Sequence, residues 1–285
     1  MLKTIAFQGV PGAFSYLAAK IAFGEQNVFV GLGTFREVFK ALEKGQVDYG
    51  ILPIENSLVG SIHENYDLLN TYKVQIIGEH YTKITHCLLG LKGEEKSLQE
   101  RLRNTKKVFS HPKALEQCKG FFLEHPWIEG VVYKDTASSA EYVSALNNPQ
   151  FAAIASQQAG EIYGLQLIQK GLEDDPQNYT RFVTIARHEK ETNKEFNKVS
   201  LVFTLEHRPG TLLSALKMFS SDEINLLKLE SRPLIGRPFE YLFYLDFEWH
   251  GKNRKEIDLL LEEFRLSVKG LKVLGSYQAG EKWIS

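Results

Sequence analysis

Residues 239–247 run Phe-Glu-Tyr-Leu-Phe-Tyr-Leu-Asp-Phe, and every second one of them, beginning with Phe239, is a large apolar side chain. Successive side chains of a strand point to opposite faces of a sheet, so this alternation predicts a strand with one buried face. The run Val199–Leu205 alternates in the same way and predicts a second strand. Leu226–Arg232 and Leu271–Tyr277 are two further strand candidates.

Two helical patterns separate these strands. Pro209-Gly210 opens the first pattern, whose apolar face comprises Leu212, Leu213, Leu216 and Phe219. The apolar face of the second comprises Ile257, Leu260, Leu261, Phe264 and Val268. The predicted order of strands and helices over residues 198–280 matches the ferredoxin-like βαββαβ motif. This fold serves many functions, so it predicts none by itself.

A connector separates this module from a larger domain. Residues 187–195 contain no apolar side chain, which is typical of a linker. Over residues 1–187, short apolar runs alternate with helical patterns, which predicts an α/β domain with largely parallel strands. One helix start carries a capping box, formed by Thr34 and Glu37. Polar residues recur where strands end and helices begin, and open α/β sheets usually bind their ligands there.

The composition argues against several classes of protein. The 34 lysines and arginines balance 35 aspartates and glutamates, so neither a nucleic-acid nor a membrane partner is indicated. Cys87 and Cys118 are the only cysteines, a pattern that argues against a disulfide framework or a zinc site and favours a reducing compartment. The N-terminus lacks the apolar core of a signal peptide, and no run has membrane-spanning length. We therefore expect a cytoplasmic protein.

Short motifs follow one another along the chain. In the larger domain they are Gly-Val-Pro-Gly-Ala-Phe-Ser at 9–15, Pro-Ile-Glu-Asn-Ser at 53–57, Ser-His-Pro at 110–112, Asp-Thr-Ala at 135–137, Ala-Ile-Ala-Ser at 153–156 and Thr-Arg-Phe at 180–182. In the C-terminal module they are His-Arg-Pro-Gly-Thr-Leu at 207–212 and Glu-Ser-Arg-Pro at 230–233. This ordered series resembles the prephenate dehydratase family, in which a catalytic region precedes an ACT regulatory domain.

The resemblance implies a fold and an activity. The catalytic region of that family is a two-lobed α/β domain like a periplasmic solute-binding protein. Residues 1–187 would form it, with about 1–77 and 159–187 in one lobe and 78–158 in the other, and residues 198–280 would form the ACT domain. The implied reaction converts prephenate to phenylpyruvate in L-phenylalanine biosynthesis. Because aromatisation of the ring drives this reaction, we expect no metal and no organic cofactor.

The resemblance also implies residues for the active site. Thr180 is the implied catalytic residue, donating a proton or hydrogen bond to the leaving hydroxyl. The implied substrate contacts are Ser15, Glu55, Asn56, Ser57, Thr136, Ala137, Ser156, Arg181 and Phe182. Local roles stay open for some of these residues, since Thr136 and Ser156 suit helix N-caps. His111 is the alternative acid because histidine titrates near neutral pH, although the proline after it favours a structural helix entry.

In the C-terminal module, the resemblance implies that phenylalanine binds as an allosteric effector where two ACT domains meet. A homodimer or homotetramer follows from such a site. The implied contacts are Pro209, Gly210, Thr211, Leu212, Leu213, Asn225, Glu230, Ser231, Arg232 and Pro233. Thr211 stands where the family usually has alanine, which narrows the pocket.

Two other functions fit parts of this pattern. Arogenate carries an amino group where prephenate carries a keto group, and the sequence does not show which of them the site accepts. A non-catalytic, two-lobed small-molecule sensor would share the fold. The missing signal peptide and the Thr-Arg-Phe motif at 180–182 argue against such a sensor.

Overall fold

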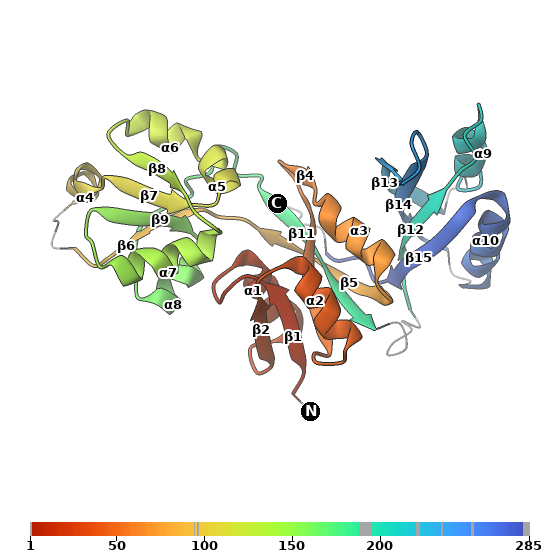
Figure 1. Ribbon diagram of the computed structural model, residues 1–285, viewed down its shortest axis with the longest axis horizontal. Helices are drawn as coiled ribbons and strands as arrows, with labels where there is room; N and C mark the ends of the chain where they lie inside the picture. The colour runs from red at the N-terminus through yellow and green to blue at the C-terminus, as the bar shows by residue number, and fades with distance from the viewer. Residues whose placement is uncertain are drawn as a thin grey trace. The chain divides into compact units, whose positions relative to one another are not determined.

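Figure 1 presents the computed structural model of the chain, which describes residues 2–93, 95, 97–187, 195–220, 223–234, 236–251 and 254–281. These residues form two compact units. The first comprises the chain up to Asn65 together with Tyr81–Phe182, and the second comprises Tyr66–His80 together with the chain from Val183 onward. The predicted connector falls largely outside the described residues.

The first sheet of the α/β domain has the strand order β2-β1-β3-β11-β5, with the short β4 paired to β3. Its strands are β1 (Thr4–Gln8), β2 (Val28–Leu32), β3 (Tyr49–Asn56), β4 (Gly60–Ser61), β5 (Val74–Lys83) and β11 (Tyr179–Arg187). The helices between them are α1 (Phe14–Phe23), α2 (Phe35–Glu43) and α3 (His63–Thr71). The strand β1 pairs in parallel with both β2 and β3, and the predicted capping box begins α2.

The second sheet belongs to the first unit and has the order β10-β6-β9-β7-β8. Its strands are β6 (Cys87–Gly90), β7 (Lys107–Ser110), β8 (Glu129–Val132), β9 (Phe151–Ala155) and β10 (Gln166–Lys170). Its helices are α4 (Leu98–Asn104), α5 (Pro112–Gln117), α6 (Lys119–Glu124), α7 (Thr136–Leu146) and α8 (Gln157–Tyr163). Along β9, Ala153 and Ala155 pack with α7 and α8, whereas Ala152 and Ile154 pack with α5 and α6 (Figure 1). Both faces of this sheet are therefore buried.

The chain returns to the first sheet later than the sequence analysis expected. Residues 159–187 were assigned to the first lobe, but β10 pairs with β6 and α8 packs in the core of the second sheet. The return comes at β11. The sequence of β10 is Gln-Leu-Ile-Gln-Lys, and nothing in so short an antiparallel edge strand indicates which sheet it joins.

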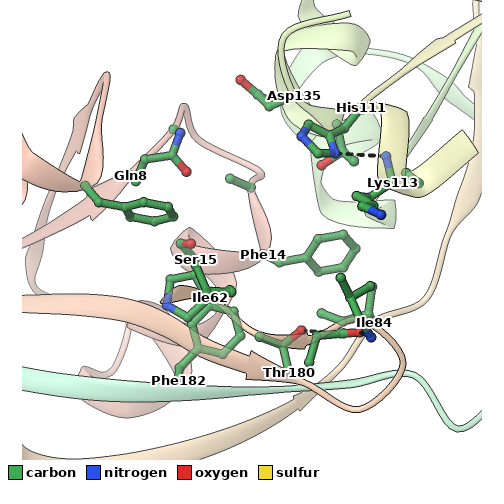
Figure 2. Close-up of a pocket in the computed structure, with 18 of the residues that line it drawn as sticks. Gln8, Phe14, Ser15, Ile62, Ile84, His111, Lys113, Asp135, Thr180 and Phe182 are labelled. Atoms are coloured by element: carbon green, nitrogen blue, oxygen red, sulfur yellow. Dashed lines mark hydrogen bonds between the residues drawn. The ribbon is translucent and has the colours of Figure 1, made fainter. Parts of the chain in front are cut away.

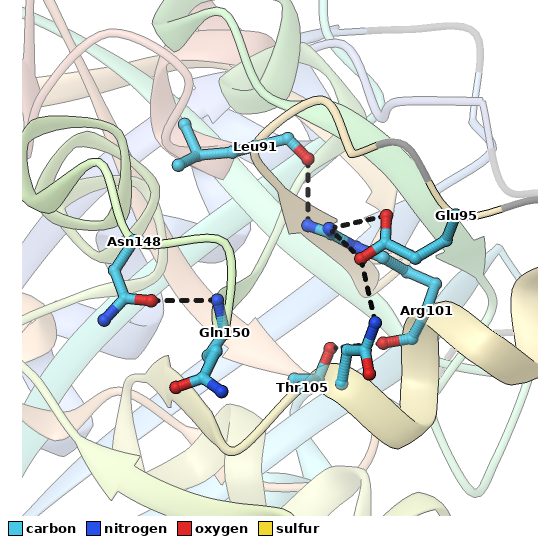
Figure 3. Close-up of polar contacts among 7 residues, drawn as sticks. Leu91, Glu95, Arg101, Thr105, Asn148 and Gln150 are labelled. Carbon is cyan, nitrogen blue, oxygen red and sulfur yellow. Dashed lines mark hydrogen bonds and ion pairs between the residues drawn. The ribbon is translucent and has the colours of Figure 1, made fainter.

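A largely buried ion pair joins Glu95 to Arg101 of α4. Arg101 Nη1 donates to both carboxylate oxygens of Glu95 at 3.0 and 3.1 Å, and Nη2 donates to the Leu91 carbonyl at 2.8 Å (Figure 3). Arg101 also lines a cavity of about 270 Å³. Because a buried charge requires such partners, we assign this arginine a structural role.

The C-terminal module has the predicted order of elements. They are β12 (Lys198–Thr204), α9 (Thr211–Lys217), β13 (Ile224–Pro233), β14 (Tyr241–Trp249), α10 (Arg254–Ser267) and β15 (Lys269–Tyr277). The sheet is antiparallel with the order β13-β14-β12-β15. Phe203 and Phe247 from the strands meet Phe219 and Phe264 in its core. The βαββαβ prediction is confirmed.

One residue of the alternating run departs from the prediction. Phe239 has a φ of 64° and is 82% exposed, whereas β14 begins two residues later, at Tyr241. A positive φ is incompatible with the extended backbone of a strand. The strand therefore starts after this residue, and because every residue from Tyr244 to Trp249 is buried, both faces of β14 are covered there rather than the one face that the alternation predicted.

Candidate active site

A cavity of about 550 Å³ opens within the first unit, where strand ends of the first sheet face helix starts of the second. Figure 2 shows Thr180 and Phe182 on one side of it and His111, Lys113 and Asp135 on the other. Phe14, from the start of α1, lies between the two sides (Figure 2). A cavity of this volume suits a small molecule.

The turn before α1 holds the two sides of the cavity together. Gly12 has a φ of 90°, and a Cβ at this position would lie 2.7 Å from the Ala159 Cα of α8. Ser156 Oγ donates to the Gly12 carbonyl at 2.7 Å and accepts from the Ala159 N–H at 3.1 Å. Glycine is required at so close an approach. Ser156 caps α8 as predicted, and its second bond ties the turn to that helix.

The Thr180 side chain lines the cavity from β11, and among the described residues its hydroxyl has one hydrogen-bond partner. Asn56, at the end of β3, donates from Nδ2 to Thr180 Oγ1 at 3.0 Å. Asn56 Oδ1 accepts the backbone N–H groups of Leu58 and Val59 at 3.0 and 3.1 Å. Because backbone N–H groups only donate, the orientation of the Asn56 amide is fixed. The Thr180 oxygen thus accepts one hydrogen bond, and its O–H can donate to a group in the cavity.

Five of the predicted active-site residues line the cavity: Ser15, Asn56, Thr136, Thr180 and Phe182. The others do not line it: Glu55, Ser57, Ala137, Ser156 and Arg181.

The residues outside the lining support it from behind. Ser57 Oγ donates to the Gln177 carbonyl at 2.7 Å and accepts from the Tyr179 N–H at 2.9 Å, which holds the start of β11. Arg181 is buried, and its Nη1 atom lies 3.8 Å from Glu55 Oε2.

The predicted cap of α7 is wrong by one residue. Asp135 is the N-cap, and its Oδ1 accepts from the Ser138 N–H at 2.7 Å. Thr136 is the first residue of the helix and faces the cavity. Aspartate and threonine both suit an N-cap, so the pattern did not distinguish the two neighbours.

Burial favours the neutral form of two histidines that line the cavity. Burial lowers the pKa of both His86 and His111, although Asp135 opposes this effect for His111. His111 Nδ1 accepts from the Lys113 N–H at 3.2 Å and so caps α5. A structural helix entry therefore accounts for His111 better than general-acid catalysis does.

The active-site residues predicted from the sequence do not include His86, Gln117 or Asn178. His86 and Gln117 line the cavity, and Asn178 is completely buried next to Asn56. Asn178 lies two positions before the Thr-Arg-Phe motif at 180–182, and this proximity is the sequence signal that could have drawn attention to it. The partners of the three side chains depend on the tertiary fold, so the sequence alone did not reveal them.

Charged groups of both signs line the cavity. Lys113 and Lys134 come from the second-sheet side together with Asp135, and Glu64 comes from α3. Among the described residues, no group of three or more histidines, cysteines, aspartates or glutamates could hold a metal ion. Nor does any helix in the described part of the chain have the length and apolar character needed to cross a membrane.

The predicted effector residues lie in the second unit. Gly210 has a φ of 81° and stands at the N-terminus of α9, where Thr211 Oγ1 donates to the Glu206 and Arg208 carbonyls. Only Thr211 and Leu212 of the predicted set line a small cavity of about 80 Å³ in this module.

Two charged side chains of that set have partners within the second unit. Arg232 Nη2 donates to Asp67 Oδ2 at 3.1 Å, and Glu230 pairs with Lys228 at 2.8 Å. The described residues of a single chain therefore do not gather the predicted effector contacts into one pocket.

Comparison with known proteins settles the family. Residues 5–190, well over half of the chain, match the sequence profile of the family described as prephenate dehydratase. The chain belongs to the prephenate dehydratase family. It is 41% identical to arogenate dehydratase/prephenate dehydratase 2, a chloroplastic protein of Arabidopsis thaliana, over 96% of this chain and 72% of that protein.

Solved structures similar to this chain agree with the family assignment. The prephenate dehydratase of Arthrobacter aurescens, solved in complex with L-Phe, has a TM-score of 0.85 and 27% identity over 96% of this chain and 89% of its own. A protein described as the quorum-quenching acylase GqqA also has a TM-score of 0.85, with 31% identity over 97% of this chain and 98% of its own. The predicted family is confirmed, and the protein is a dehydratase of L-phenylalanine biosynthesis.

Proposed function

We propose that the cavity of the first unit binds prephenate and converts it to phenylpyruvate. The bond from the ring to its carboxylate breaks, and the electron pair enters the ring. At the opposite ring position, the carbon–oxygen bond to the hydroxyl breaks. The prephenate dianion and one proton thus give the phenylpyruvate anion, carbon dioxide and water. Aromatisation drives the reaction, so the protein must supply orientation and one proton or hydrogen bond.

The Thr180 hydroxyl is the observation that carries this proposal. It lines the cavity, and the fixed Asn56 amide occupies one lone pair of its oxygen. The O–H is then directed away from Asn56 and can bond to the departing hydroxyl oxygen of the substrate. A threonine hydroxyl is a weak acid, so its main contribution is a preorganised hydrogen bond that strengthens as negative charge develops. The net proton comes from solvent.

The substrate carboxylates have suitable partners on the cavity wall. The N-terminus of α1 has no side-chain cap, so the backbone N–H groups at its start can bind a carboxylate. Lys113 and Lys134 add two positive charges across the cavity. Two lysines and a helix N-terminus complement the two carboxylates of prephenate.

Phenylalanine is the effector that we propose for the C-terminal module. The A. aurescens relative was solved with L-Phe, and the module has the βαββαβ fold expected of an ACT domain. The predicted effector residues would form a pocket between two copies of the module, which requires a homodimer or homotetramer. We also propose a cytoplasmic location, which cell fractionation tests.

The acylase relative suggests a different reaction for the same fold. Amide hydrolysis needs a nucleophile activated by a base. The described partner of Thr180 Oγ1 is the donating Asn56 amide rather than a histidine or a carboxylate. This arrangement favours dehydration.

Substrate choice is tested by measuring kcat/KM for prephenate and arogenate in parallel, with an acyl-amide substrate as a third arm. We expect kcat/KM to be higher for prephenate than for arogenate, with no hydrolysis of the amide. A higher kcat/KM for arogenate would identify arogenate, rather than prephenate, as the preferred substrate and would leave the proposed mechanism unchanged. Hydrolysis of the amide without phenylpyruvate formation would overturn the proposal.

A further inference from the structure

A chain of hydrogen bonds runs behind the cavity wall from Thr180 to His86. Besides Thr180 Oγ1, Asn56 Nδ2 donates to Asn178 Oδ1 at 2.8 Å and to the Tyr179 carbonyl at 3.1 Å, so its two hydrogens are shared among three acceptors. Asn178 Oδ1 is thereby an acceptor, so Asn178 Nδ2 is the atom that donates to Gln117 Oε1, at 3.1 Å. Gln117 Oε1 lies 2.8 Å from His86 Nε2. The chain joins β3 and β11 of the first sheet to α5 beside the second.

The direction of each bond in this chain follows from the fixed Asn56 amide. Gln117 Oε1 can only accept, so His86 Nε2 must carry a hydrogen. His86 is 2% exposed, and its Nδ1 atom is buried without a hydrogen-bond partner in the described part of the chain. Adding a second proton at such an atom is unfavourable, and burial lowers the pKa of His86 accordingly. The ring is therefore the neutral Nε2–H tautomer.

Two members of the chain, Thr180 and Gln117, are left with hydrogens that can donate into the cavity. Asn56 occupies the Thr180 oxygen, which leaves the Thr180 O–H to donate. His86 and Asn178 occupy Gln117 Oε1, which leaves the Gln117 Nε2 hydrogens to donate from a residue that lines the cavity. Carboxylate and hydroxyl oxygens of the substrate are acceptors for such groups. If the Asn56 amide were reversed, the Thr180 hydroxyl would donate to Asn56 and present its oxygen to the substrate. If the Gln117 amide were reversed, its oxygen would face the substrate in place of its N–H groups.

We propose that Asn178 and His86 are positioning residues for the dehydration, which hold the Gln117 amide so that its N–H groups and the Thr180 O–H face the substrate together. Neither needs to touch the substrate. The completely buried Asn178 is the central member, because it accepts on one side and donates on the other. This inference rests on the proposed role of Thr180.

The substitution Asn178→Asp tests the direction of the chain. At neutral pH the carboxylate introduced at position 178 would still accept from Asn56 but could not donate, so the Gln117 amide should rotate and present its oxygen to the substrate. We expect kcat/KM to fall about 10- to 100-fold. On acidification the protonated carboxyl can donate to Gln117 Oε1 again. Burial raises the pKa of a carboxyl group, so we expect the one at position 178 to become protonated between about pH 8 and about pH 5.5. The ratio of wild-type to variant kcat/KM should therefore decrease toward one as the pH falls through this range.

The matched control is Asn148→Asp, which makes the same change outside the cavity. Asn148 Oδ1 accepts from the Gln150 N–H at 3.0 Å, and a carboxylate can do the same (Figure 3). Its kcat/KM and pH profile should match the wild type.

His86 provides the second set of variants. His86→Gln restores an N–H donor and should keep most of the activity, whereas His86→Leu should lower kcat/KM about tenfold. In the Asn178→Asp background, His86→Leu should lower kcat/KM little further, because the Gln117 amide is already reversed.

Nitrogen NMR of the His86 ring gives a readout that does not depend on turnover. The wild-type ring should show the Nε2–H tautomer, a result that stands even if Asn178→Asp fails to fold, and the Nδ1–H tautomer would overturn the inference. An active wild type whose ratio to Asn178→Asp stays constant with pH would likewise overturn it while leaving the proposed function intact. A wild type inactive toward both prephenate and arogenate would overturn the proposed function and this role together.

Discussion

One neighbouring amide orients the Thr180 hydroxyl for its proposed role as hydrogen-bond donor to the departing hydroxyl of the substrate. Asn56 is locked by two backbone N–H groups, and it donates to the Thr180 oxygen at 3.0 Å. A hydroxyl whose oxygen already accepts a bond becomes a somewhat better donor, because chained hydrogen bonds polarise one another. The Thr-Arg-Phe motif identified Thr180 from the sequence. Its orientation depends on the fold, which brings β3 next to β11.

Thr180→Val removes this hydroxyl and keeps the shape of the side chain. We expect kcat to fall on the order of 10²-fold or more, with little change in KM, because the lost bond strengthens mainly at the transition state. Thr180→Ser retains the hydroxyl and should keep more of the rate. Steady-state kinetics with prephenate measure both. A Thr180→Val variant with near-normal kcat would move the donor role elsewhere, with His111 the first candidate.

Buried neutral histidine also makes stability depend on pH. Burial lowers the pKa of His86 in the folded chain below the ordinary value near 6.5. Above about pH 6.5 both folded and unfolded chains hold the ring neutral; below it the unfolded chain takes up a proton that the folded chain resists. The free energy of unfolding should therefore decrease as the pH falls through this region. His80 and His111, whose pKa values burial also lowers, act in the same direction.

The variant His86→Gln isolates the contribution of His86. Urea unfolding at a series of pH values should show that wild type loses stability on acidification faster than the variant does. An equal loss in both would contradict the assignment of a lowered pKa to His86.

Among the elements, β12 and β5 are joined by a buried ion pair in the second unit. Lys198 Nζ donates to both carboxylate oxygens of Glu79 at 2.9 Å, and Glu79 Oε1 also accepts from the Gly280 N–H at 3.1 Å. Both side chains are almost fully buried. Removing one charge would leave the other buried without this ion pair.

Lys198→Met should accordingly destabilise the protein by about 3–5 kcal/mol. The double variant Lys198→Met/Glu79→Gln removes both charges while the introduced amide oxygen can still accept from Gly280, so it should recover part of this loss. Lys107→Met, at the exposed pair with Glu129, is the control and should cost little. Thermal or urea unfolding measures all three. A Lys198→Met variant as stable as the Lys107→Met control would contradict the burial argument.

Local signals explain which elements the sequence predicted. Period-2 apolar runs predicted β12 and β14, and the capping box predicted the start of α2, because each signal is contained in a few neighbouring residues. The position of β10 was missed because sheet membership depends on residues far along the chain. The amide chain behind the cavity was missed for the same reason: Asn56 and Asn178 are 122 positions apart.

At the scale of the whole molecule, regulation requires that phenylalanine favour a conformation with a less competent cavity. Gly210, the N-cap of α9, has a φ of 81°, and a Cβ there would meet no described atom within 4 Å. Substitution by valine therefore acts through the backbone, since a positive φ is energetically costly for a β-branched residue. The predicted effector pocket includes the N-terminus of that helix.

We expect Gly210→Val to raise the phenylalanine concentration for half-maximal inhibition by about tenfold or more. Gly236→Val is the matched control, because Gly236 has a φ of 84° and equally open surroundings in the same module but is not among the predicted contacts. Calorimetry and inhibition kinetics measure the two variants. Equal loss of phenylalanine sensitivity in both would point to general strain, and no loss in either would place the effector elsewhere.

The most direct test of the whole account is to incubate the purified protein with prephenate in the presence of a chelator and to follow phenylpyruvate by its absorbance in alkali. The account predicts full turnover under these conditions, because the ring supplies the driving force and the cavity's own side chains supply the orientation and the hydrogen bond. Failure to form phenylpyruvate, or an activity that EDTA abolishes and added zinc or magnesium restores, would contradict it.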